Sequence, residues 1–227
     1  CKFGIAPGAL LGTVPPGTSV PLGYGMSCIV EGVGNWYTIF SHMFMHGNFM
    51  HILFNMYALF IFGQVLENVW GPKRFLLYYL VTGFGAALLH ESVIAIEYSN
   101  LVRMLTPEEV NTVIAEGGAL WQEGKLYADT SMQALQTLLN VPTVGASGAV
   151  FGILLAFGVL FPNTQLMIIF PPIPIKAKYF VLIYGGIELI LAFTQPGSNI
   201  AHFAHLGGML FGYFLIRYWR KTTKTLY

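Results

Sequence analysis

The chain has 227 residues, of which 55% are hydrophobic and only 9% are charged, too few polar residues to cover a water-soluble globule of this size. The formal net charge of +1 provides no attraction for polyanions, which excludes nucleic acid as an expected partner. Several apolar stretches approach the roughly 20 residues that cross a hydrocarbon core. The composition therefore predicts an integral, multi-pass protein of the lipid bilayer.

Residues 1–35 form a leader rich in glycine and proline. It shows neither helical nor strand periodicity, and we expect it to be an irregular segment outside the membrane. Both cysteines, Cys1 and Cys28, lie in this leader, so neither a disulfide framework nor a cysteine metal cage is indicated. The chain begins with Cys1 and carries no signal-peptide pattern. We therefore expect that processing or truncation removed residues upstream.

A membrane domain is expected over residues 36–219, followed by a basic cytoplasmic tail over residues 220–227. Five apolar segments within this domain are predicted to be transmembrane helices. They cover residues 45–66, 75–89, 147–161, 179–193 and 201–219.

Residues 90–144, between the second and third segments, are predicted to be a solvated external excursion because they carry seven acidic residues. Within the excursion, Thr106-Pro107-Glu108-Glu109 supplies an N-cap residue, a first-turn proline and acids at the positive end of a helix dipole. These signals predict a short amphipathic helix that runs towards Leu120. Its apolar face, with Val110, Val113 and Ile114, should lie on the bilayer surface or on the bundle.

The basic residues predict the orientation of the chain in the membrane. Eight of the eleven lie at span ends that one topology places on the same side, which marks the cytoplasm. The leader and the excursion are then external, the C-terminus is cytoplasmic, and we expect a bacterial cytoplasmic membrane. The eight are Lys73, Arg74, Lys176, Lys178, Arg217, Arg220, Lys221 and Lys224.

Two short motifs on different apolar segments could carry chemistry: Gly145-Ala146-Ser147-Gly148 and Ala204-His205-Leu206-Gly207-Gly208. Serine is a useful nucleophile only when a base accepts its proton, and His205 is the natural base for Ser147. The two residues are expected at similar depth, near the external ends of their helices. No Asp or Glu stands near either residue in the sequence, so a dyad is predicted rather than a triad. Glu188 lies in the middle of a span with no evident partner in the sequence, and its role is left open.

The glycines beside these two residues have a geometric role in this interpretation. Gly148 with Gly152, and Gly208 with Gly212, form small ridges that let two membrane helices approach closely. Phe151, one turn after Ser147, could pack flat against the imidazole of His205. Taken singly, a glycine–serine motif in a membrane helix is more often a packing motif, and a lone histidine is more often a hydrogen-bonded packing residue. The match of the two motifs in depth favours a catalytic interpretation.

A second polar cluster leads into the first segment. His51 and Asn55 are four residues apart and share one helical face. Their side-chain donors suit an oxyanion hole together with the backbone N–H of Ser147. The competing interpretation is a zinc or copper site built on His42, His46 and His51 with help from His90 or His202, but only His42 and His46 have the i, i+4 spacing of paired ligands. His202 is expected to be a structural hydrogen-bonding partner.

These motifs together resemble those of the rhomboid family of intramembrane serine proteases. The resemblance covers roughly residues 36–219 and includes His46-x-x-x-x-His51-x-x-x-Asn55 and the two motifs that contain Ser147 and His205. It implies that Ser147 is the nucleophile, that His205 is the general base, and that His51 with Asn55 stabilises the oxyanion. It further implies an all-α, polytopic helix bundle that cuts the transmembrane segments of other membrane proteins without a cofactor.

The sequence departs from the family in three respects. Five membrane segments are visible where the family's core has six, the missing one being the first, and an apolar span upstream of Cys1 would complete the bundle. Trp36-Tyr37 stands where the family has tryptophan followed by arginine, and Phe151 stands where it often has tyrosine.

The alternative function is that of a non-catalytic rhomboid-like protein that binds membrane helices. Neither the substrate nor the oligomeric state is indicated by the sequence.

Overall fold

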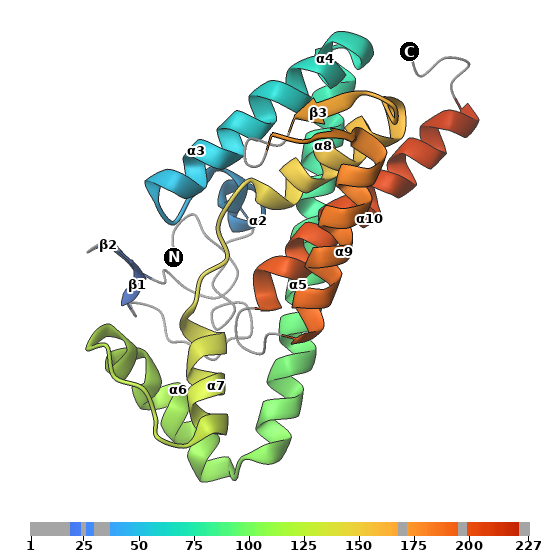
Figure 1. The fold of residues 1–227 in the computed structure, drawn as a ribbon. Helices are drawn as coiled ribbons and strands as arrows, with labels where there is room; N and C mark the ends of the chain where they lie inside the picture. Colours follow the sequence, from blue (N-terminus) through green and yellow to red (C-terminus); the bar gives the residue numbers. More distant parts are fainter. Residues whose placement is uncertain (1–18, 24–25, 30–36, 168–171, 195–198, 223–227) are drawn as a thin grey trace. The chain divides into compact units, whose positions relative to one another are not determined.

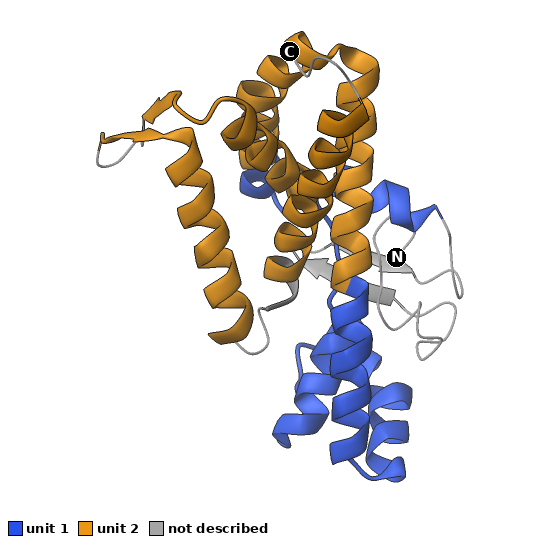
Figure 2. Cartoon of the chain, turned by 90° about the vertical axis from the view of Figure 1, so that its right-hand side faces the viewer, with its two compact units in different colours: residues 1–52, 91–145 blue, residues 53–90, 146–227 orange. Residues whose placement is uncertain are grey.

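The computed structural model describes residues 19–23, 26–29, 37–167, 172–194 and 199–222, and most of these residues are helical (Figure 1). The chain divides into two compact units (Figure 2). Unit 1 comprises residues 1–52 and 91–145, and unit 2 comprises residues 53–90 and 146–227. The predicted fold class, an all-α polytopic membrane bundle, is confirmed.

Each of the five segments that were predicted to span the membrane contains a helix, although the first becomes helical only at Phe49 rather than at Met45. The first is a continuous helical stretch made of α3, a π-helical turn η2 and α4. In the part of the chain that the structure describes, three helices are long and apolar enough to cross a membrane: Phe49–Trp70, Pro72–Met104 and Ala177–Thr194. The bounds are α3 Phe49–Ala58, η2 Leu59–Gly63, α4 Gln64–Trp70, α5 Pro72–Met104, α8 Ser147–Leu160, α9 Ala177–Thr194 and α10 Asn199–Thr222.

The centre of unit 2 is α8, a short apolar helix in which nearly every side chain is buried. A helix that is apolar all round belongs in the interior of a bundle. By contrast, α9 exposes many large apolar side chains, such as Leu182, Ile190 and Phe193. Such a surface is stable against lipid rather than water.

Glycines bring α8, α10 and the first part of α5 into close contact. A Cβ atom added at Gly208 of α10 would overlap the carbonyl oxygen of Gly148 in α8. One added at Gly148 would overlap the Cβ atom of Ala86 in α5, and one added at Gly152 would lie 2.6 Å from the Cβ atom of Thr82. Only residues without a side chain permit this backbone approach.

The prediction that residues 90–144 leave the helix at residue 90 was wrong. Helix α5 continues through the expected span and on to Met104, 33 residues in all. No proline or glycine lies between Leu89 and Met104, and isolated glutamates are good helix formers that do not stop a helix. The helix ends only before Thr106-Pro107, where a capping box begins the next helix.

Unit 1 contains α6 (Pro107–Gln122) and α7 (Thr130–Asn140). The predicted amphipathic helix is therefore present: the Thr106 hydroxyl accepts from the Glu109 backbone N–H, and the Glu109 carboxylate accepts from the Thr106 backbone N–H. Its apolar face packs on α7, where Val110 and Val113 form a buried cluster with Leu135 and Leu139.

Short elements complete the fold. The leader was expected to be irregular, yet β1 (Ser19–Gly23) and β2 (Met26–Ile29) pair as antiparallel strands. Neither segment shows strict alternation of apolar and polar residues, and Pro21 within β1 argues against a strand, so the sequence did not predict this pair. The rest of the leader, with Cys1, and the tail beyond Thr222 lie outside the described residues. The other elements are α2 (Thr38–Ser41), η1 (His42–Phe44) and the antiparallel pair β3 (Gln165–Met167) and β4 (Pro174–Lys176).

Candidate active site

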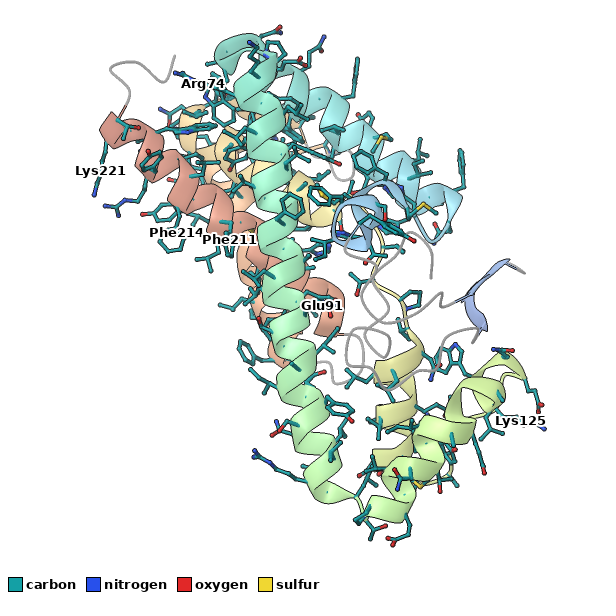
Figure 3. All side chains as sticks on the ribbon, turned by 180° about the vertical axis from the view of Figure 1, so that it is seen from behind. Arg74, Glu91, Lys125, Phe211, Phe214 and Lys221 are labelled. Atoms are coloured by element: carbon teal, nitrogen blue, oxygen red, sulfur yellow. The ribbon has the colours of Figure 1, made fainter. Side chains whose placement is uncertain are left out.

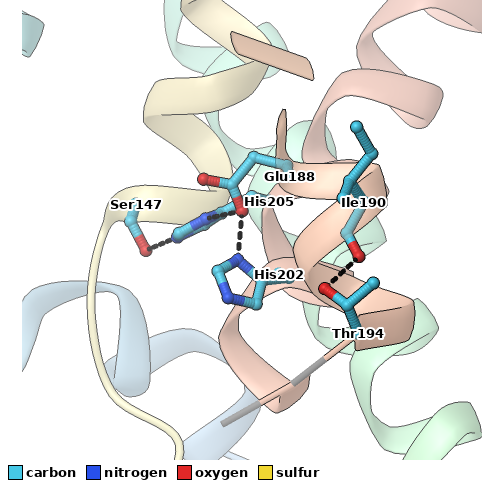
Figure 4. Close-up of polar contacts among 6 residues, drawn as sticks. All are labelled: Ser147, Glu188, Ile190, Thr194, His202 and His205. Atoms are coloured by element: carbon cyan, nitrogen blue, oxygen red, sulfur yellow. Dashed lines mark hydrogen bonds and ion pairs between the residues drawn. The ribbon is translucent and has the colours of Figure 1, made fainter. Parts of the chain in front are cut away.

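The hydroxyl of Ser147 and the imidazole of His205 lie within hydrogen-bond distance of each other. Ser147 is the first residue of α8, and its Oγ is 2.9 Å from Nε2 of His205 on α10 (Figure 4). Both residues are half-buried and belong to unit 2. The serine stands at the positive end of the α8 dipole, where negative charge is stabilised.

The chain turns sharply just before Ser147. Gly145 has φ of +129°, a conformation that residues with a side chain rarely adopt, and its N–H donates to the carbonyl of His42 at 2.8 Å. After the serine, the contact between Gly148 and Gly208 holds the backbones of α8 and α10 together. The short serine side chain can therefore reach the histidine on the neighbouring helix.

Glu188 of α9 adds a third group that the sequence did not connect to this pair. Its Oε2 lies 3.0 Å from Nδ1 of His205 and 2.6 Å from Nδ1 of His202 (Figure 4). The Glu188 side chain is only 8% exposed. The predicted absence of a carboxylate beside the histidine was wrong, because the acid comes from a helix that approaches only in three dimensions. The one signal in the sequence was an ionisable residue in the middle of an apolar helix.

The face of the His205 ring is also covered. Phe151 stacks on it with 4.1 Å between ring centroids and 6° between planes. On its other side Phe151 stacks on Tyr184, at 5.2 Å and 12°. Ring contacts of this kind restrict the rotation of the imidazole.

The residues of the predicted oxyanion pair lie on α3. Asn55 is buried, and His51 is half-buried four residues earlier on the same helix. Asn48 accepts from the His51 backbone N–H at 2.8 Å and so caps the start of the helix. Asn55 belongs to the same compact unit as Ser147, whereas His51 belongs to unit 1.

The predicted metal alternative receives little support from the other histidines. Nδ1 of His42 lies 3.2 Å from the Thr38 carbonyl oxygen, and burial lowers the pKa of His42. The rings of His46 and His51 meet edge to face at 5.1 Å. Among the described residues, the one group of three potential ligands close enough to share an ion is Glu188, His202 and His205. There a cation would have to replace the protons that the histidines share with the carboxylate.

Comparison with known proteins recognises a rhomboid domain over residues 33–222. The chain belongs to the rhomboid family. The rhomboid protease AarA of Providencia stuartii is 28% identical over 188 residues, which are 79% of this chain and 54% of that protein. The putative rhomboid protease YdcA of Bacillus subtilis is 26% identical over 182 residues, or 80% of this chain and 66% of the relative.

A mitochondrial relative, RHOMBOID-like protein 12 of Arabidopsis thaliana, is 29% identical over 178 residues, covering 77% of this rhomboid chain and 44% of the relative. The chain spans about half the length of curated relatives that it matches. No solved structure matches it.

Proposed function

We propose that this rhomboid protein is a serine endopeptidase that cleaves the transmembrane segments of other membrane proteins. The observation that carries the proposal is the 2.9 Å contact between Ser147 Oγ and His205 Nε2 at the start of a buried apolar helix. Membership of a family that includes relatives named as proteases supports it.

In the proposed reaction, His205 Nε2 accepts the proton of the Ser147 hydroxyl while Oγ attacks the peptide carbonyl carbon. The carbonyl oxygen becomes an oxyanion next to the positive end of α8, with His51 and Asn55 as proposed donors. When the C–N bond breaks, His205 returns the proton to the leaving amine. Water then attacks the acyl-enzyme with the same histidine as base, which releases the second product and restores Ser147.

The substrate must expose a peptide bond before this chemistry can begin. A transmembrane helix hides its carbonyl groups in its own hydrogen bonds, so the segment has to unwind locally at the depth of Ser147. Glycine and other poor helix formers in the substrate lower the free energy of that unwinding. We propose, as substrates, membrane proteins with such residues near the external end of a span. We also propose a bacterial cytoplasmic membrane as the location.

The direct test is cleavage of a transmembrane reporter by the purified protein in lipid vesicles. Ser147→Ala should lower kcat/KM by about 10⁴-fold or more, because nothing replaces the nucleophile. Ser99→Ala, a matched serine substitution on α5, should cleave like the unaltered protein. A fluorophosphonate probe should label the protein only when both Ser147 and His205 are present. Cleavage by Ser147→Ala would refute the proposal, and intact folding with neither cleavage nor labelling would favour a helix-binding protein.

A further inference from the structure

The carboxylate of Glu188 occupies a costly position. It stands in the middle of α9, a helix that is otherwise apolar over most of its 18 residues, and its side chain is almost completely buried. An ionisable group at such a depth needs hydrogen-bond partners. Its Oε2 atom forms hydrogen bonds with two imidazole nitrogens of α10, one from His202 and one from His205.

The contact between Glu188 and His205 determines which imidazole nitrogen of His205 carries a proton. A carboxylate only accepts hydrogen bonds, so the proton between Glu188 and His205 resides on Nδ1. Nε2 is then unprotonated and can accept the hydroxyl proton of Ser147, 2.9 Å away. The other tautomer would place a proton on Nε2 and leave Ser147 without a base.

We propose that Glu188 is the positioning residue of His205, so that Ser147, His205 and Glu188 act as a triad rather than a dyad. This inference rests on the proposed function. Glu188 touches neither the nucleophile nor the substrate in this scheme. It holds the ring in the productive tautomer and stabilises the positive charge that the ring acquires when Ser147 attacks.

His202 has a secondary part in the arrangement. Its Nδ1 lies 2.6 Å from the Oε2 atom that also faces His205, and the two rings are nearly perpendicular, with centroids 6.4 Å apart. His202 thus provides a second hydrogen bond to the same oxygen, from the external end of α10, and this bond holds Glu188 in one rotamer. His202→Ala should therefore lower kcat less than a change at Glu188, because His205 keeps its acceptor.

The test compares Glu188→Gln with Glu188→Asp and with Glu67→Gln, a matched control on α4 whose side chain is exposed. The amide of glutamine offers a donor as well as an acceptor, so it no longer selects the tautomer. Glu188→Gln should lower kcat for a transmembrane reporter by about 10²- to 10⁴-fold and leave KM unchanged. Glu188→Asp keeps the charge and should recover part of the loss, and Glu67→Gln should behave like the unaltered protein.

A second measurement needs no variant of Glu188 and decides the matter even if Glu188→Gln does not fold. Histidine ¹⁵N spectra of the unaltered protein in lipid, with the His205 signal assigned by its loss in His205→Ala, report the tautomer of the neutral ring. Protonated Nδ1 with bare Nε2 is expected. The opposite tautomer, or full kcat in a folded Glu188→Gln, would overturn the role of Glu188 while leaving Ser147 and His205 intact. Failure of the unaltered protein to cleave or to be labelled would instead contradict the proposed function.

Discussion

At the scale of single residues, the imidazole of His205 is restrained from three directions. Ser147 meets Nε2, Glu188 meets Nδ1, and Phe151 covers one face of the ring. Two hydrogen bonds along the ring edge leave rotation about their common axis open, and a flat aromatic contact opposes that rotation. The hydrogen bonds and the stacking contact therefore oppose different movements of the ring, and mutation of each residue can separate their effects.

Phe151→Leu should lower kcat by about 2- to 12-fold, the rate equivalent of the roughly 0.5–1.5 kcal/mol that a stacked pair contributes. Phe151→Tyr should retain activity because it keeps the ring. The control is Phe157→Leu on the same helix, since Phe157 is equally buried but packs on Phe62 and Phe161. The measurement is kcat on a transmembrane reporter together with thermal unfolding. Equal loss of kcat at residues 151 and 157 would mean that the aromatic ring acts through stability alone.

What the sequence predicts at this scale depends on how local the signal is. Ser147 and His205 stand in short glycine-containing motifs, so both could be proposed before any coordinates were known. Glu188 has no motif, and its partner is 17 residues away on the next helix. Its role depends on how α9 and α10 rotate about their axes when they pack, which no periodicity in a single sequence reports.

At the scale of helices, contact between glycines sets the distance from Ser147 to His205. Gly148 follows the nucleophile and Gly208 follows the histidine by less than one turn. The distance between Ser147 and His205 is therefore maintained only if α8 and α10 are in contact at this point. Activity and stability should respond together to any side chain placed there.

Gly208→Ala should destabilise the protein by about 1–3 kcal/mol and lower cleavage strongly, because the added Cβ overlaps the Gly148 carbonyl oxygen. The matched control is Gly186→Ala on α9, where a Cβ meets nothing within 4 Å. This change should raise stability by about 0.5–1 kcal/mol through helix propensity. Thermal unfolding in detergent and reporter cleavage measure both effects. A Gly208→Ala protein as stable as the unaltered one would show that the two helices do not touch at this residue.

The sequence predicted the helices better than their ends. Thr106-Pro107 marked the start of α6 correctly because an N-cap and a first-turn proline are local signals. The end of α5 was misplaced by 15 residues because charged side chains were interpreted as the end of the helix. Helix α7 was not predicted, although Asp129 supplies an N-cap and Met132, Leu135 and Leu139 recur at helical spacing, so its local signals were overlooked.

At the scale of the whole molecule, charge is distributed unevenly along the chain. In unit 2, Arg74 near the start of α5 and Lys221 near the end of α10 lie at the same end of the helices (Figure 3). Lys178, at the start of α9, follows the same sequence pattern of basic residues at alternate span ends. Lys125, after α6, is one of the three basic residues outside this pattern. The charges therefore predict one orientation in the membrane.

Two single-cysteine proteins test this orientation. Cys1 and Cys28 are first replaced by serine, and Lys125→Cys and Lys221→Cys are then made separately, at residues that are both exposed. Because basic residues are retained on the cytoplasmic side, a membrane-impermeant maleimide added to intact bacterial spheroplasts should label residue 125 and not residue 221. After permeabilisation both should be labelled. The reverse pattern in intact spheroplasts would put the N-terminal end of α8 on the cytoplasmic side, and Ser147 would then face substrates from the interior of the cell.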